Sequence, residues 1–499
     1  MEKSCIVVAL DGLSDRSCVE LGHLTPLQAA MMPNLDDIAA RGSSGLYHAL
    51  CPWVMAPAEA AHFIMLGYVP DEFPGRGYVE ALSEGIPFTD EDVVFIASLV
   101  KVSRSGSTLV VDQWWPECSP EELKTVCDAI ETYKDNYGTV EFYKTRRGGI
   151  AVAKGEVSSK VCDADPCIPG MPVVRVEPLG PYAHNPAAIR CANLMNAYIR
   201  HAFFRLSSHP INVKRVMEGK SPLNGIVTWG AGQTLSVMPF AEKWGLHALG
   251  IANGGAMQGV YKAAGIMAQG LPEEPRPEEE MALKLDRALQ SIKDYELVYL
   301  HSDVLERASR LKDPLAKVQV LEAVDRGFAS FVHELESRPD IIAVIVGGPA
   351  ALSTGSRLSS GEPSPLVIAG DGLWRDGVQG FDEVHCSRGC LGKVSGTQLM
   401  QILLSLLGRS RLWGRRDIPL DLPHYPGVRK PLLLDSECGS QGVFHEHEGF
   451  WTTRAKSASR SGVWDLTKLG LISLAIMTTC HVFSSGALMV ISLSVHAAG

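Results

Sequence analysis

The hydrophobic positions along the chain change their spacing several times, and each spacing predicts a different element. Residues 5–10 (CIVVAL) form a continuous apolar run ending at Asp11, which is typical of a strand buried on both faces. Similar runs occur at 225–228, 247–251, 297–301, 341–346 and 365–369. Helical spacing occupies 239–244, 278–293, 314–337 and 395–407. This alternation predicts an α/β fold with a mostly parallel sheet and helices on both faces.

A second texture begins near residue 92. Strand-like runs at 92–102, 108–112 and 149–153 surround one helical segment at 120–133. A helix at 186–206 then leads back to the α/β pattern. We therefore expect a core formed by 1–91 and 186–411, with residues 92–185 inserted as an α+β cap domain.

The periodic pattern ends after Arg411. Residues 412–461 are rich in Pro, Gly and charged side chains, so we expect a disordered linker. Residues 462–499 form a hydrophobic tail, in which 469–495 contains no Asp, Glu, Lys or Arg. A bilayer span needs about 20 apolar residues, so this tail is long enough for a membrane anchor. An interfacial helix and an unfolded extension are the alternatives, because Ser, Thr, Gly and His481 dilute the segment.

Composition narrows the partners and the compartment. The net charge is −10 and the isoelectric point about 5.9, without a dense Lys/Arg stripe, so nucleic acid is not an expected partner. The twelve Cys follow no regular framework. Glu2 and Lys3 lead directly into the first predicted strand, so we expect no signal peptide. These features favour a cytoplasmic protein with reduced thiols.

The most informative turn lies at 54–62 (VMAPAEAAH), before a helix-like run that starts at Phe63. An α/β phosphoryl-transfer enzyme places its nucleophile at such a turn, because the N-terminus of a helix offers free N–H groups and a positive dipole to a phosphate. Here the central residue is Ala58, which has no nucleophilic atom. Either other residues carry out the chemistry or it has been lost.

Many short motifs recur in one order along residues 4–410. They include DGLSD at 11–15, TPLQAA at 25–30, MPNLD at 32–36, LGY at 66–68, GRG at 75–77, HPINVKR at 209–215 and WGAG at 229–232. In this order the chain resembles the archaeal-type, cofactor-independent phosphoglycerate mutases of the alkaline phosphatase superfamily. The resemblance implies an alkaline-phosphatase-like core with an inserted cap.

The resemblance also implies a reaction, the interconversion of 2-phosphoglycerate and 3-phosphoglycerate in glycolysis. In that family two divalent metals (Mn, Mg or Zn) activate a Ser, which takes the phosphoryl group and returns it to the other hydroxyl. Paired metals neutralise charge on the attacking and leaving oxygens. A covalent intermediate divides one difficult step into two.

Most family positions for this chemistry are altered here. Asp11 matches the first metal-binding Asp, whereas Ala58 replaces the nucleophilic Ser. Glu306 keeps an oxygen ligand, but Arg310 stands where the family has a metal-binding His. Three further ligand positions fall at Gly347, Gly348 and near Ser359. Asp11 and Glu306 are the metal-ligand candidates that remain, so we expect no bound cofactor.

Substrate contacts are reduced as well. Cations that remain near the expected junction of core and cap include Arg76, Arg147 and Arg215. Guanidinium groups are well suited to phosphate, so these three are the candidate ligands for a small phosphorylated acid. Isolated histidines such as His62 and His209 are interpreted as structural.

Three functions follow. The leading hypothesis is a non-catalytic homologue, a pseudoenzyme with a binding or regulatory role. The second is an active metal-dependent mutase or phosphoryl-transfer enzyme with relocated ligands. The third is a scaffold tethered to a membrane through 469–495.

Overall fold

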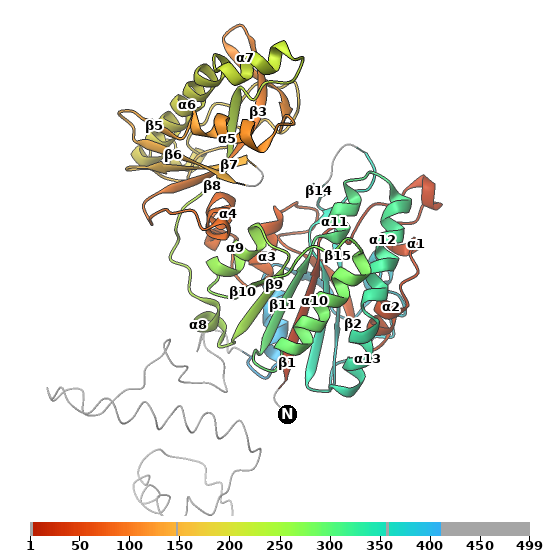
Figure 1. Cartoon of the computed structure of the whole chain (residues 1–499). Coiled ribbons are helices and arrows are strands. Elements are labelled where there is room, and N and C mark those ends of the chain that lie inside the picture. The colour runs from red at the N-terminus through yellow and green to blue at the C-terminus, as the bar shows by residue number, and fades with distance from the viewer. Residues whose placement is uncertain (1–2, 146–147, 356–358, 411–499) are drawn as a thin grey trace, which may run out of the picture. The chain divides into compact units, whose positions relative to one another are not determined.

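The computed structural model describes residues 3–145, 148–355 and 359–410, which form a core sheet with helices on both faces and a smaller cap sheet with its own helices (Figure 1). The predicted linker at 412–461 and hydrophobic tail at 462–499 lie outside the described residues. Within the described ranges, no helix is long and apolar enough to cross a membrane.

The core sheet has eight strands in the order β10-β9-β11-β1-β12-β15-β2-β16. Their bounds are β1 (Ser4–Leu10), β2 (Gly42–His48), β9 (Ala248–Ala252), β10 (Met267–Gly270), β11 (Leu297–Ser302), β12 (Ile341–Gly347), β15 (Ser364–Ala369) and β16 (Gly392–Ser395). Neighbouring strands are parallel except that β15 runs antiparallel to both β12 and β2. The predicted α/β class with a mostly parallel sheet is confirmed.

Alternate side chains of β1 enter two separate hydrophobic clusters, because side chains along a strand point to opposite faces. Val7 belongs to one cluster and Val8 to the other. The Val7 cluster packs against α3 (Ala58–Met65), α8 (Phe240–Trp244), α9 (Ala256–Ala263) and α15 (Gln398–Leu406). The Val8 cluster packs against α2 (Pro33–Ala40), α10 (Pro277–Ser291), α12 (Pro314–Gly327) and α13 (Ala329–Ser337). The continuous apolar run of this strand therefore fits a sheet buried on both faces.

The cap is built on an antiparallel sheet in the order β4-β3-β7-β6-β5, with β8 pairing the free side of β3. Its strands are β3 (Val93–Ser105), β4 (Thr108–Trp114), β5 (Thr132–Lys134), β6 (Thr139–Thr145), β7 (Gly148–Lys154) and β8 (Gly225–Gly232). Its helices are α5 (Pro120–Asp128), α6 (Pro186–Ser207) and α7 (Pro210–Met217).

The predicted cap boundary at residue 185 is wrong. The run at 225–228 was expected in the core sheet, but it lies in β8 and pairs with β3. Helix α6 also packs into the cap cluster, where Leu194 and Tyr198 are buried against the sheet. The cap therefore extends to Gly232. A short apolar run is compatible with either sheet, so periodicity alone could not assign it.

Other differences concern element boundaries. The segment 314–337 forms two helices that meet at Phe328, and the helix expected at 120–133 ends at Asp128. Strand β2 was not predicted because its sequence, GSSGLYH, has weak strand propensity and is set by pairing with β15. The remaining short elements are α1 (Pro26–Ala29), α11 (Val304–Ser309), α14 (Glu383–Cys386), β13 (Ala350–Ala351), β14 (Ser359–Ser360) and three 3-10 turns at Val19–Leu21, Pro70–Glu72 and Gly180–Tyr182.

Helix α4 (Arg76–Glu84) approaches the cap strands closely through two glycines. A Cβ on Gly75 would lie 2.4 Å from the carbonyl oxygen of Ala231, and one on Gly77 would lie 2.3 Å from that of Val94. Gly75 also has a φ of +98°, which side-chain-bearing residues rarely adopt. This close approach places Arg76 beside strand β8, where its guanidinium lies over the ring of Trp229.

Candidate active site

Three neighbouring strands and one helix bring the candidate residues together. Strand β1 lies between β11 and β12, with Ala9 opposite His301 and Leu10 opposite Gly347. Asp11 therefore follows β1 at the carboxyl edge of the sheet, where open α/β folds place their ligands. Helix α3 adds His62 to the same edge.

Both carboxylate oxygens of Asp11 face a histidine. Asp11 Oδ1 lies 2.8 Å from His62 Nε2, and Asp11 Oδ2 lies 3.0 Å from His301 Nε2. The two imidazole rings are almost perpendicular, with centroids 4.8 Å apart. All three side chains are buried, with residue exposures of 3% for Asp11, 0% for His62 and 7% for His301.

The histidines keep the Asp11 carboxyl ionised. Burial alone raises the pKa of this carboxyl, because the charged form loses its hydration. The charges and hydrogen bonds of His62 and His301 act in the opposite direction and outweigh burial, so the pKa of Asp11 lies below its usual range. The site thus presents a carboxylate between two imidazoles.

Tyr299 fixes the other side of His62. The Tyr299 hydroxyl lies 2.7 Å from His62 Nδ1 and 2.9 Å from Met65 Sδ. It can donate its proton to the imidazole, or donate to the sulfur and accept from Nδ1–H. Tyr299 therefore supports either tautomer of His62, including the one in which Nε2 carries a free lone pair.

The expectation of no bound cofactor is wrong. It rested on Asp11 and Glu306 alone, whereas the described residues include a buried group, Asp11, His62 and His301, whose ligand atoms all lie within 4.8 Å of one another. A carboxylate and two imidazoles are a donor set that divalent transition metals use.

The same structure does not fit the paired-metal arrangement that the motifs implied. Gly347 ends β12 and Gly348 follows it beside Asp11, but neither supplies a side-chain donor. A Cβ on Gly348 would lie only 1.7 Å from Asp11 Oδ1. The Asp11 carboxylate thus fills the space for a side chain at Gly348, and Ser364 does so at Gly347, where a Cβ would lie 2.6 Å from the Ser364 Cβ.

The other ligand candidate, Glu306, is not part of this group. Its carboxylate pairs with Arg310 at 2.6 Å one turn along the chain, and the Glu306 and Arg310 side chains are 25% and 59% exposed. The Arg310 guanidinium is thus paired with the Glu306 carboxylate. Metal binding by Glu306 stays a prediction.

Ala58 is the first residue of α3, directly after the N-cap Pro57. His62 follows it by four residues and so lies on the same face of the helix, one turn further along. The methyl group of Ala58 can neither attack a phosphoryl group nor be activated by a base. The N-terminus of α3 is therefore formed, but residue 58 provides no nucleophile there.

The three predicted phosphate ligands lie in different situations. Arg76 lies over the ring of Trp229 at 4.5 Å, and its Nε is 3.2 Å from Glu59 and 3.8 Å from Glu80. Arg147 lies outside the described residues. The Arg76 side chain is 36% exposed, so its guanidinium is partly accessible to a ligand.

Arg215 is buried inside the cap, with 2% exposure. Its guanidinium donates to Glu122 at 2.6 Å and to the carbonyl oxygens of Glu117 and Ser221 at 2.6 and 2.9 Å. These contacts hold α7 against the start of α5, and they lend no support to the predicted role in substrate binding.

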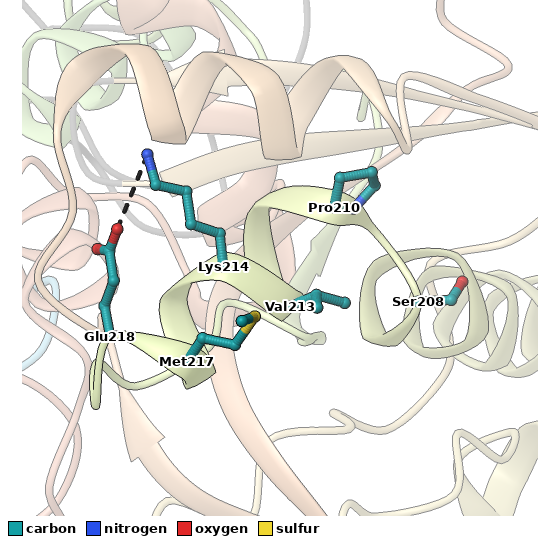
Figure 2. Close-up of a pocket in the computed structure, with 6 residues that line it drawn as sticks. All are labelled: Ser208, Pro210, Val213, Lys214, Met217 and Glu218. Carbon is teal, nitrogen blue, oxygen red and sulfur yellow. Dashed lines mark ion pairs between the residues drawn. The ribbon is translucent and has the colours of Figure 1, made fainter.

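Two hollows in the described part of the chain differ in size and in their distance from the Asp11, His62 and His301 group. A cavity of about 30 Å³ lies between Ala56, Ala61 and Gly348, and it is also lined by His48 and Glu362. It has room for one or two waters, too little for a phosphorylated three-carbon acid. A wider surface hollow of about 590 Å³ lies on α7 in the cap (Figure 2), lined by Ser208, Pro210, Val213, Lys214, Met217 and Glu218. It includes none of the Asp11 group.

Sequence reasoning missed His62, His301 and Tyr299 as a unit. His62 was interpreted as structural, which is reasonable for an isolated histidine, and His301 and Tyr299 were not considered as site residues. The available signal was position: His62 lies one helical turn after Ala58, and His301 is the last residue of the strand predicted at 297–301.

The chain is similar to a known family of enzymes along most of its length. A family model described as 2,3-bisphosphoglycerate-independent phosphoglycerate mutase matches residues 39–212. The mutase of that name from Methanopyrus kandleri is 31% identical over 424 residues, covering 83% of this chain and 99% of the relative. A second such mutase, from Methanocaldococcus jannaschii, is 32% identical over 425 residues, covering 82% of this chain and 95% of the relative.

Solved structures give the same relationship. The PH0037 protein from Pyrococcus horikoshii has a TM-score of 0.67 at 26% identity, covering 83% of this chain and all of that chain. The cofactor-independent phosphoglycerate mutase from Thermoplasma acidophilum has a TM-score of 0.57 at 27% identity, covering 81% of this chain and all of that chain. With the core, the cap and the ordered motifs in agreement, this chain belongs to the 2,3-bisphosphoglycerate-independent phosphoglycerate mutase family.

Proposed function

We propose that this family member does not catalyse the mutase reaction and instead has a binding or regulatory role. The observation that carries the proposal is Ala58 at the start of α3, where the reaction needs a nucleophilic oxygen. The site around it agrees, because Gly347 and Gly348 supply no donors to a second metal. The fold is retained while the groups that would form and break a phosphoserine are lost.

The rival is an active phosphoryl-transfer enzyme with relocated ligands. The Asp11, His62 and His301 group is the observation that favours it, since these residues offer one metal-capable donor set. A single ion leaves either the attacking or the leaving oxygen without a metal partner. Residues 54–65, which contain α3 and the turn before it, include no Ser, Thr or Cys that could take the place of Ala58. Fold alone does not decide between the two functions.

One assay separates these functions. Purified full-length protein would be tested for conversion of 2-phosphoglycerate to 3-phosphoglycerate with manganese, magnesium or zinc supplied separately. We expect turnover no higher than in a reaction without protein. Metal-dependent turnover that a chelator abolishes would establish the rival function.

We further propose that the ligand is a small phosphorylated acid and that Arg76 contacts its phosphate. Arg76 is partly exposed and stacked on Trp229 of the cap, but it already faces Glu59 and Glu80. A ligand would have to compete with these carboxylates, so weak binding is expected. Calorimetry with 3-phosphoglycerate would test this, comparing Arg76→Met with Arg326→Met at an exposed site on α12. Equal binding by both variants would remove Arg76 from the proposal.

A further inference from the structure

We propose that Asp11, His62 and His301 bind one divalent first-row transition metal ion, Zn²⁺ in preference to Mg²⁺, at a site that replaces the paired-metal arrangement. The three donors come from the end of β1, from α3 and from β11. Gly348 and Ala58, where further donors would be needed for two ions, supply none. The inference concerns metal binding and does not depend on whether the protein turns over substrate.

The spacing of the donors suits one ion. Tetrahedral zinc with bonds of about 2.0–2.1 Å keeps its ligand atoms roughly 3.3 Å apart. The two carboxylate–imidazole distances, 2.8 and 3.0 Å, are slightly shorter than this, and all three donor atoms lie within 4.8 Å of one another. Around an ion, the two carboxylate–imidazole distances would lengthen by about 0.3–0.5 Å, and the donor atoms that lie farthest apart would approach by up to about 1.5 Å.

The chemistry of the donors selects the class of metal. Two imidazole nitrogens and one carboxylate oxygen are a mixed set suited to Zn²⁺ or Fe²⁺. Mg²⁺ requires a nearly octahedral shell of oxygens and keeps several waters, which a buried site with two nitrogen donors does not offer. Zinc fits this site best, because it accepts three protein ligands and one further ligand.

Tyr299 completes the site as a positioning residue. A metal-bound His62 must leave Nε2 unprotonated and carry its proton on Nδ1. That proton then points at the Tyr299 oxygen, 2.7 Å away, while the hydroxyl proton has Met65 Sδ as an acceptor at 2.9 Å. Metal-binding histidines commonly have such a partner on the second ring nitrogen, and losing it weakens binding by about 10- to 100-fold.

The test uses the full-length protein stripped with a chelator. Co²⁺ and Zn²⁺ would be titrated by visible absorption and calorimetry, and bound metal would be counted by mass spectrometry. We expect one ion per chain, with a cobalt spectrum typical of four-coordinate nitrogen and oxygen ligands and without a sulfur-to-cobalt band. Binding of two ions, of none, or of Mg²⁺ as tightly as Zn²⁺ would overturn the proposal.

Variants locate the ion. His301→Gln and His62→Gln should each weaken zinc binding at least 100-fold. His301 is the less buried of these two residues. Tyr299→Phe should weaken it about tenfold while keeping one ion per chain. His333→Gln, at an exposed position on α13, is the control and should bind zinc like the unmodified protein.

Circular dichroism of each metal-free variant would establish that it is folded before affinities are compared. If His62→Gln does not fold, His301→Gln and Tyr299→Phe still decide the outcome. Unchanged zinc affinity in folded His301→Gln would show that the ion binds elsewhere, and the proposal would be rejected.

Discussion

At the carboxyl edge of the sheet, the Asp11 carboxylate fills the space that a side chain on Gly348 would need. A Cβ on Gly348 would lie 1.7 Å from Asp11 Oδ1 and 3.3 Å from Asp11 Cα. The carboxylate is held there by His62 and His301, so it cannot move away without losing two hydrogen bonds. The absence of a side chain at residue 348 and the position of the Asp11 group are therefore linked.

Gly348→Ala should destabilise the fold by about 1–3 kcal/mol, because overpacking displaces neighbouring atoms in a well-packed interior. Urea unfolding of the metal-free protein would measure the change. Gly180→Ala is the control, since a Cβ there meets no atom within 4 Å. If Gly348→Ala were as stable as Gly180→Ala, the Asp11 carboxylate would be more mobile than its contacts indicate.

The fold was largely predictable because strand β1 and its neighbours are apolar on both faces, as a buried parallel sheet requires. Strand β2 was not, since its Gly and Ser residues become a strand only by pairing with β15. The lack of a nucleophilic oxygen at residue 58 was readable from sequence alone. The Asp11, His62 and His301 group was not, because it depends on how β1, β11 and α3 meet in space.

Lys317 is a second buried group whose role the fold explains. Its Nζ lies 3.0 Å from Asp15 Oδ2 and 2.8 Å from the carbonyl oxygen of Ala351, and both charged side chains are fully buried. Lys317→Met leaves the Asp15 carboxylate buried without its cation. We expect a loss of about 3–5 kcal/mol in the free energy of unfolding.

The matched control is Arg326→Met, which breaks an exposed pair with Glu278 at 2.9 Å. Exposed pairs contribute about 0–1 kcal/mol, so this variant should remain close to the unmodified protein. The double variant Asp15→Asn with Lys317→Met should recover part of the lost stability, because no unpaired charge remains buried. If Lys317→Met were as stable as Arg326→Met, the role given to Lys317 would be contradicted.

Glu383 should make the stability depend on pH. Burial raises the pKa of this carboxyl from 4.5 to about 7, although it accepts hydrogen bonds from Thr25 Oγ1 at 2.8 Å and from the Asp15 amide at 3.2 Å. The folded protein thus holds the proton more tightly than the unfolded chain. The stabilisation is fully present below about pH 4.5 and is lost as the pH rises to about 7.

Glu383→Gln removes this titration. The decrease in unfolding free energy between pH 5 and pH 8 should become smaller by up to about 3 kcal/mol. Chemical unfolding at a series of pH values would measure it, with the exposed Glu242→Gln as the control. An identical pH profile in the Glu383→Gln variant would show that the carboxyl titrates normally.

Ala58→Ser restores the missing hydroxyl but should not restore mutase activity. The new oxygen would stand at the first position of α3, where it has a helix N-terminus but no pair of metals to activate it. The variant should fold normally, with a stability change within about 0.5 kcal/mol, because the substitution is small. Turnover of 2-phosphoglycerate with manganese, magnesium or zinc should stay at the level of the Ala58 protein. A measurable gain from this single change would mean that the residues around Gly347 and Gly348 still support a two-metal reaction, and the proposal of a non-catalytic protein would then be wrong.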